Sequence, residues 1–136
     1  MIVVDTNVMV TLVVGGPGGV EAARLYGQDK EWAAPPILIS ELRNVLIGSV
    51  RRGVIPRHEA VSMVDHASLV LGDRVFDVSH SDVLDVALNC GLTAYDAEFV
   101  VVARRLGVSL ATADRAILRN APDVAAPLST LANGQA

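Results

Sequence analysis

The sequence predicts an α/β fold built on a mostly parallel sheet. Short apolar runs alternate with segments of helical periodicity along the chain, and this alternation is typical of strands joined by crossover helices. The runs are short and uninterrupted, as in Ile2-Val3-Val4, which is typical of strands buried on both faces. No internal repeat or long linker divides the sequence. We therefore expect a single domain over residues 1–132 and a frayed tail over residues 133–136.

The first half of the chain is divided by a glycine-rich loop, Gly15–Gly19, and by Pro35-Pro36. The loop is not followed by Gly-Lys-Ser/Thr, so it is not a phosphate-binding P-loop. Apolar runs and helical spacing predict, in order, the strand Ile2–Asp5, the helix Val20–Gln28, the strand Glu31–Ala34, the helix Pro36–Arg52 and the helix Arg57–Leu71. Proline suits the first turn of the Pro36–Arg52 helix because that turn needs no N–H donor there.

The second half is divided by glycines that suit the position just after a helix, Gly91 and Gly107. The predicted elements are, in order, the strand Arg74–Val78, the helices Ser81–Cys90 and Tyr95–Leu106, the strand Ser109–Thr112, the helix Asp114–Asn120 and the edge strand Val124–Ala126. Ligands of parallel sheets bind at the carboxyl ends of strands, so these ends are where functional residues are expected.

Composition limits the class of protein. The chain has 136 residues, of which 51% are hydrophobic and 19% are charged, and this excludes a disordered chain. The apolar runs are too short to span a bilayer, and no basic leader precedes the first strand, so we expect a cytoplasmic protein. A single cysteine, Cys90, excludes a disulfide framework and a cysteine-rich zinc site.

The net charge of −4 excludes a positive electrostatic potential over the whole protein that would bind nucleic acid. It does not exclude a nuclease, because acidic residues gathered in one cleft can be neutralised by divalent cations, which then supply the local positive charge.

Four carboxylates stand out by their position: Asp5, Glu41, Asp96 and Asp114. Each aspartate follows a predicted strand or opens a predicted helix, where a capping role alone would explain it. Glu41 lies within the apolar stripe of its helix, where a carboxylate is costly unless it is paired or bound to a metal ion. Such carboxylates, if they converge, raise one another's pKa and need cations or shared protons. Oxygen-only ligands suit Mg²⁺ or Mn²⁺, which can activate water against a phosphodiester.

These residues lie in motifs that resemble those of the PIN-domain family, and most closely its small VapC-type toxins. The matching segments, in chain order, are Ile2-Val3-Val4-Asp5-Thr6-Asn7, Ser40-Glu41-Leu42, Leu92-Thr93-Ala94-Tyr95-Asp96-Ala97 and Leu110-Ala111-Thr112-Ala113-Asp114-Arg115. The resemblance implies a three-layer α/β/α sandwich and a metal-dependent endoribonuclease that uses Mg²⁺ or Mn²⁺. It also implies a homodimer that is held inactive by a VapB-type antitoxin.

The resemblance implies a role for each matching residue. Asp5 and Asp96 would be direct metal ligands, and Glu41 would bind the metal directly or through water. Asp114 would bind a second ion or a metal-bound water. Hydrogen bonds from Thr6, Asn7 and Thr112 would orient these carboxylates or the scissile phosphate.

A nuclease also needs positive charge for the phosphate backbone. Arg43 follows Glu41 on the same helix and Arg115 directly follows Asp114, so both are candidates near the site. Glu98 follows Asp96 by two residues, and we expect it to face solvent or an interface.

Two other hypotheses for the function remain open. The chain could be another Mg²⁺-dependent phosphoryl-transfer enzyme or a receiver domain, although Asp5-Thr6-Asn7 lacks a second aspartate and the only lysine is Lys30. Alternatively, it could be a non-catalytic PIN-fold module that binds RNA or a partner. All four acidic positions are filled, which argues against that reading.

Overall fold

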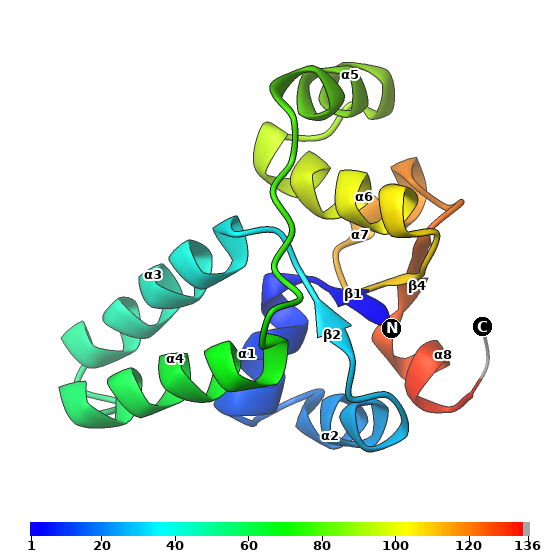
Figure 1. The fold of residues 1–136 in the computed structure, drawn as a ribbon. Coiled ribbons are helices and arrows are strands. Elements are labelled where there is room, and N and C mark those ends of the chain that lie inside the picture. The colour runs from blue at the N-terminus through cyan, green and yellow to red at the C-terminus, as the bar shows by residue number, and fades with distance from the viewer. Residues whose placement is uncertain (135–136) are drawn as a thin grey trace.

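The computed structural model describes residues 1–134. In it, helices cover both faces of a four-stranded parallel sheet (Figure 1). The strands are β1 (Ile2–Val4), β2 (Trp32–Ala33), β3 (Leu110–Thr112) and β4 (Ala125–Pro127), in the spatial order β2-β1-β3-β4. Every neighbouring pair is parallel. β1 and β3 are fully buried and occupy the centre of the sheet.

The helices form a layer on each side of the sheet. They are α1 (Thr6–Val13), α2 (Gly19–Gln28), α3 (Ile37–Arg51), α4 (Arg57–Leu71), α5 (His80–Cys90), α6 (Ala94–Leu106), α7 (Arg115–Asn120) and α8 (Leu128–Ala132). In Figure 1, α5, α6 and α7 lie above the sheet, and α1, α2, α4 and α8 lie below it. This arrangement confirms the predicted α/β sandwich.

The core is continuous from one helical layer through the sheet to the other. Trp32, Phe99, Met9, Leu38 and Leu42 are among its largest fully buried side chains. They come from β2, α6, α1 and α3, so each layer contributes to one hydrophobic cluster. The α3–α4 hairpin extends sideways from this core (Figure 1).

The predicted strand Arg74–Val78 is wrong: only Val75 pairs, in a single bridge with Ala34. The Ala34 N–H donates to the Arg74 carbonyl, and the Phe76 N–H donates to the Ala34 carbonyl. The ladder ends there because Pro36, the next residue that would donate from the neighbouring strand, has no N–H.

Two helices were not expected from the sequence. α1 is rich in β-branched valine and threonine, which disfavour helices in isolation, but the carboxylate of Asp5 caps its N-terminus. α8 follows β4 directly and buries Leu128 and Ala132. The remaining predicted strands and helices are present, with ends shifted by a few residues at most.

The C-terminal end of the described chain packs against α2. Asn133 Oδ1 accepts a hydrogen bond from Arg24 Nη1 at 2.8 Å, whereas Gln135 and Ala136 of the expected tail lie outside the described residues. Within residues 1–134, no single helix is long and apolar enough to cross a membrane. α5 and α6 reach the necessary length and apolar character only in combination, and they are bent by 108° relative to each other.

The Leu42→Ala variant tests how strongly the core holds α3. Leu42 is fully buried, so we expect the free energy of unfolding to fall by about 2–5 kcal/mol through lost burial and a new cavity. Leu69→Ala is the control, because Leu69 on α4 is 81% exposed and its truncation should change stability by about 0.5 kcal/mol or less. Urea unfolding measures both variants. Equal losses would contradict the assignment of α3 to the core.

Candidate active site

Between β1 and β3, the direction in which the chain adds strands to the sheet reverses. After β1, the chain adds β2 on one side, and it later adds β3 on the other side. Such a switch point leaves a crevice between the two strand ends, which is where parallel sheets bind ligands. Asp5 follows β1 at this crevice, and Thr112 is the last residue of β3.

Asp5 is buried, with 6% of its surface exposed, and is held at both carboxylate oxygens. Its Oδ1 accepts a hydrogen bond from the Thr6 N–H at 2.7 Å, and its Oδ2 accepts one from Thr112 Oγ1 at 2.8 Å. Burial raises the pKa of Asp5 from 3.8 to about 6, and the nearby charges of Asp96 and Glu41 add to the rise, which the hydrogen bonds only partly oppose.

Thr6 connects Asp5 to Glu41 on α3. Its backbone N–H binds Asp5, and its hydroxyl donates a hydrogen bond to Glu41 Oε1 at 2.7 Å. Glu41 is half-buried, next to the fully buried Leu42. One threonine therefore sets the relative position of two carboxylates that lie far apart in the sequence.

Thr112 connects Asp5 to Asp114 in a similar way. The Thr112 hydroxyl donates to Asp5 and accepts a hydrogen bond from the Asp114 N–H at 3.0 Å. Asp114 is the N-cap of α7, where its Oδ1 accepts from the Ile117 N–H at 3.0 Å. Asp114 therefore caps α7, as a helix-opening aspartate can, and this hydrogen bond fixes one oxygen of its carboxylate.

Asp96 lies in the first turn of α6, opposite the strand ends. Its N–H donates to the hydroxyl of Thr93, the N-cap residue, at 3.1 Å. Partial burial raises the pKa of Asp96, and the neighbouring charges of Asp114 and Glu41 raise it further. Asp96 thus shares its electrostatic environment with the other three carboxylates.

All four carboxylates line one pocket of about 430 Å³. The other residues that line it are Thr6, Asn7, Ile37, Ser40, Asn44, Val45 and Tyr95. None of these residues is basic. In the part of the chain that the structure describes, no lysine, arginine or histidine forms an ion pair with any of the four carboxylates.

The pocket suits a hard divalent cation by the chemistry of its donors, which are all oxygens. The hydrogen bonds above still leave free lone pairs on each carboxylate. Among residues 1–134, however, no three histidine, cysteine or carboxylate side chains form a ready-made metal cluster. A cation here would fill its remaining positions with water, as Mg²⁺ commonly does.

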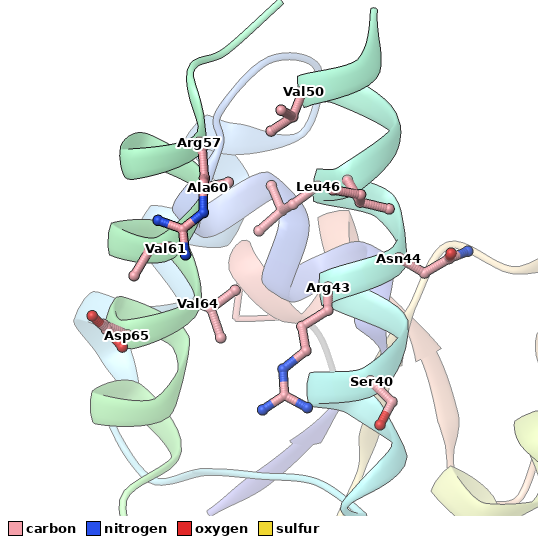
Figure 2. A pocket seen from close by; sticks show the side chains of 11 residues that line it. Ser40, Arg43, Asn44, Leu46, Val50, Arg57, Ala60, Val61, Val64 and Asp65 are labelled. Atoms are coloured by element: carbon pink, nitrogen blue, oxygen red, sulfur yellow. The ribbon is translucent and has the colours of Figure 1, made fainter.

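The two predicted arginines lie outside this pocket. Arg43 lines a groove between α3 and α4, with side chains from both helices around it (Figure 2). Arg115 lines a separate hollow that includes Thr112 and Gly18 of the glycine-rich loop. Arg115 thus lies beside Thr112, but on another surface.

The structure adds several residues to those that the sequence indicated near the site. Glu98 is half-buried and lines a separate pocket with His80 and Ala94. Burial raises the pKa of Glu98, and the charge of Glu41 raises it further. Ser40 and Asn44 are four residues apart on one side of α3, and Asn44 follows Glu41 by three residues, so helical spacing could have indicated both. Tyr95 directly precedes Asp96 and also lines the pocket.

An acidic pocket at the ends of central parallel strands agrees with the resemblance seen in the sequence, and the chain belongs to the PIN domain family, which matches residues 2–122. It is 28% identical to Ribonuclease VapC3 of Pyrobaculum aerophilum over 129 residues, which cover 93% of this chain and 98% of that relative. The crystal structure of PAE2754 from Pyrobaculum aerophilum has the same fold, with a TM-score of 0.79 and 24% identity, covering 98% of this chain and 87% of that one. These likenesses confirm the expected family resemblance.

The Asp5→Asn variant tests the electrostatic cost of the buried carboxylate. Its pKa is about 6 in the folded chain against 3.8 for the ordinary group, so in metal-free buffer the wild type should lose up to about 3 kcal/mol of stability as the pH rises from about 4 to 8. The amide cannot ionise, so Asp5→Asn should lose much less over this range.

Urea unfolding at both ends of that pH range, with EDTA present, measures the effect. Asp85→Asn on the exposed face of α5 is the matched control and should keep the wild-type pH dependence. The same pH dependence in Asp5→Asn and in the wild type would show that Asp5 is not the titrating group.

Proposed function

We propose that this chain is a metal-dependent endoribonuclease of the VapC type, and the toxin of a VapB–VapC pair. The observation that carries the proposal is the pocket in which Asp5, Glu41, Asp96 and Asp114 meet without a basic partner among the described residues. The similarity to Ribonuclease VapC3 supports RNA as the substrate.

In the proposed mechanism, Asp5 and Asp96 would hold the cation, Glu41 would bind it directly or through water, and Asp114 would hold a second ion or a water. The Mg²⁺ or Mn²⁺ ion would lower the pKa of water and offset the negative charge that develops on the phosphate. Thr6 and Thr112 keep the carboxylates in position through the hydrogen bonds described above.

Asn7 and the two arginines are proposed to contact the substrate. Asn7 is exposed, lines the pocket and can donate to a phosphate oxygen from its amide. Arg43 lines the groove that shares Ser40 and Asn44 with the pocket, and Arg115 lines a separate hollow beside Thr112, so each would bind a phosphate of the RNA outside the pocket.

The antitoxin part of the proposal rests on the groove of about 650 Å³ between α3 and α4 (Figure 2). Its apolar lining comes from Leu46, Ile47, Val50, Ala60, Val61 and Val64. Ser40 and Asn44 line both this groove and the acidic pocket, so the two are continuous. An amphipathic segment of a VapB-type antitoxin fits the groove, and a basic side chain beyond its apolar part would pair with the carboxylates.

The proposal also includes the homodimer and the cytoplasmic location expected from the sequence. Leu84 and Leu88 on α5 are exposed apolar side chains, and they support a further protein contact.

The Asp96→Asn variant tests the nuclease. We expect purified wild-type protein to cut cellular RNA with Mg²⁺ or Mn²⁺ and to stop on addition of EDTA. Asp96→Asn should lower the cleavage rate by about 100-fold or more, because a metal ligand is lost. Gel analysis of labelled RNA measures the rate, and Asp85→Asn is again the control.

Undiminished cleavage in EDTA or in Asp96→Asn would overturn the metal mechanism. If the folded wild type does not cleave RNA, and Asp96→Asn binds RNA as well as the wild type does, the chain is a binding module instead.

The Val61→Asp variant tests the antitoxin groove. Val61 is 44% exposed within the groove, and a carboxylate there would be buried by a bound antitoxin. Val61→Asp should therefore weaken inhibition by the cognate antitoxin by about 10-fold or more, measured relative to the variant's own uninhibited cleavage rate. Leu69→Asp, on α4 outside the groove lining, is the control. Titration of the antitoxin against cleavage activity measures both. Unchanged inhibition of Val61→Asp would place the antitoxin elsewhere.

A further inference from the structure

We propose that Tyr95 is the platform on which a base of the substrate stacks beside the cleavage point. The inference rests on the proposed ribonuclease function and adds to it a binding residue.

Tyr95 is an aromatic side chain that the fold does not use. It is 63% exposed, although it lies in the first turn of a helix whose other aromatic residue, Phe99, is fully buried. Within residues 1–134, its ring packs against no other aromatic ring and its hydroxyl forms no side-chain hydrogen bond. The capping of α6 is supplied by Thr93, so Tyr95 is not needed to start the helix.

The exposed ring nevertheless lies at the acidic pocket. Tyr95 lines it and directly precedes Asp96, which puts an aromatic surface within one residue of a proposed metal ligand. A nucleotide whose phosphate is held at the carboxylates would have its base within reach of this ring.

The side of the pocket formed by α3 is also partly apolar. Ile37 and Val45 line it from α3, four residues before and after Glu41. Residues at this spacing follow one another along a helix face at intervals of about 6 Å. Glu41 is therefore flanked by two apolar side chains, and the pocket combines carboxylates with surfaces that suit the faces of bases.

Charge cannot supply the affinity for RNA in this pocket. Its lining holds four carboxylates and no basic residue, and the chain as a whole has a net charge of −4. A cation offsets part of the repulsion, but it does not hold the neighbouring nucleotides. Stacking on an aromatic side chain does not depend on charge, and it is the common way in which proteins bind unpaired bases.

A duplex cannot use this platform. Its bases are stacked on one another, and their faces become available only in loops, bulges and single strands. If Tyr95 binds a base by stacking, its contribution to binding should therefore be present for unpaired RNA and absent for a duplex.

The experiment separates binding from cleavage by using Asp5→Asn as the background, since this variant should leave the RNA uncut. A short single-stranded RNA of mixed sequence, labelled with a fluorophore, is titrated with Asp5→Asn and with Asp5→Asn combined with Tyr95→Ala. We expect Tyr95→Ala to weaken binding by about 5- to 150-fold, and Tyr95→Phe to restore it because the ring is kept.

Two controls distinguish stacking from a general effect. Leu69→Ala removes another exposed apolar side chain, 81% exposed on α4 and outside the pocket, and should leave binding unchanged. A duplex of the same sequence should bind weakly and show no dependence on Tyr95. In the otherwise native chain, Tyr95→Ala should raise KM for single-stranded RNA far more than it lowers kcat.

The outcomes of these measurements separate the stacking role of Tyr95 from the nuclease activity. Cleavage by the wild type, with equal RNA binding whether residue 95 is Tyr or Ala, overturns the stacking inference and leaves the nuclease intact. Binding that depends on Tyr95, in a wild type that does not cleave, supports the inference and overturns the nuclease. Preference for the duplex, or loss of binding in Tyr95→Phe, overturns the inference.

Discussion

The hydrogen bonds that hold the buried carboxylate of Asp5 set the geometry of the whole site. One oxygen is bound by the N–H of Thr6 and the other by the hydroxyl of Thr112, so Asp5 joins the ends of β1 and β3 and also caps α1. Burying a carboxylate without a cationic partner is costly, and its raised pKa records that cost. The central strands tolerate it because hydrogen bonds satisfy both oxygens and because a bound cation would remove the penalty.

The same uncompensated charge gives a common physical basis to the proposed activity and its proposed control. A divalent cation and a basic side chain of an antitoxin would both neutralise the pocket, so they would compete for it. The groove between α3 and α4 meets the pocket at Ser40 and Asn44, which would let a partner anchored on apolar surface deliver that charge. RNA gains nothing from the charge of the pocket itself, and for this reason the exposed ring of Tyr95 matters in the proposed binding of substrate.

Much of the fold and the acidic positions could be predicted from the sequence, because strand ends and helix starts are local features. Asp5 and Asp114 were expected at strand ends, and they lie there. What could not be predicted depends on partners distant in the chain. The hydrogen bond from Thr6 to Glu41, the helix α1 made of poor helix formers, and the position of Arg43 in a separate groove are set by tertiary packing. The predicted strand Arg74–Val78 does not form beyond a single bridge, because Pro36 on the neighbouring segment has no N–H to donate.

Thr112 shows that the positions of the carboxylates depend on how the strands of the sheet pair. Its hydroxyl donates to Asp5 and accepts from the N–H of Asp114, so a single group relays position from β1 to the start of α7. Only a hydroxyl performs both roles at this length: valine would do neither, and a carboxylate would accept but could not donate. The parallel pairing of β1 with β3 brings Thr112 to Asp5. The register of the sheet and the spacing of the carboxylates are therefore one property, and a slip in the first would dismantle the second.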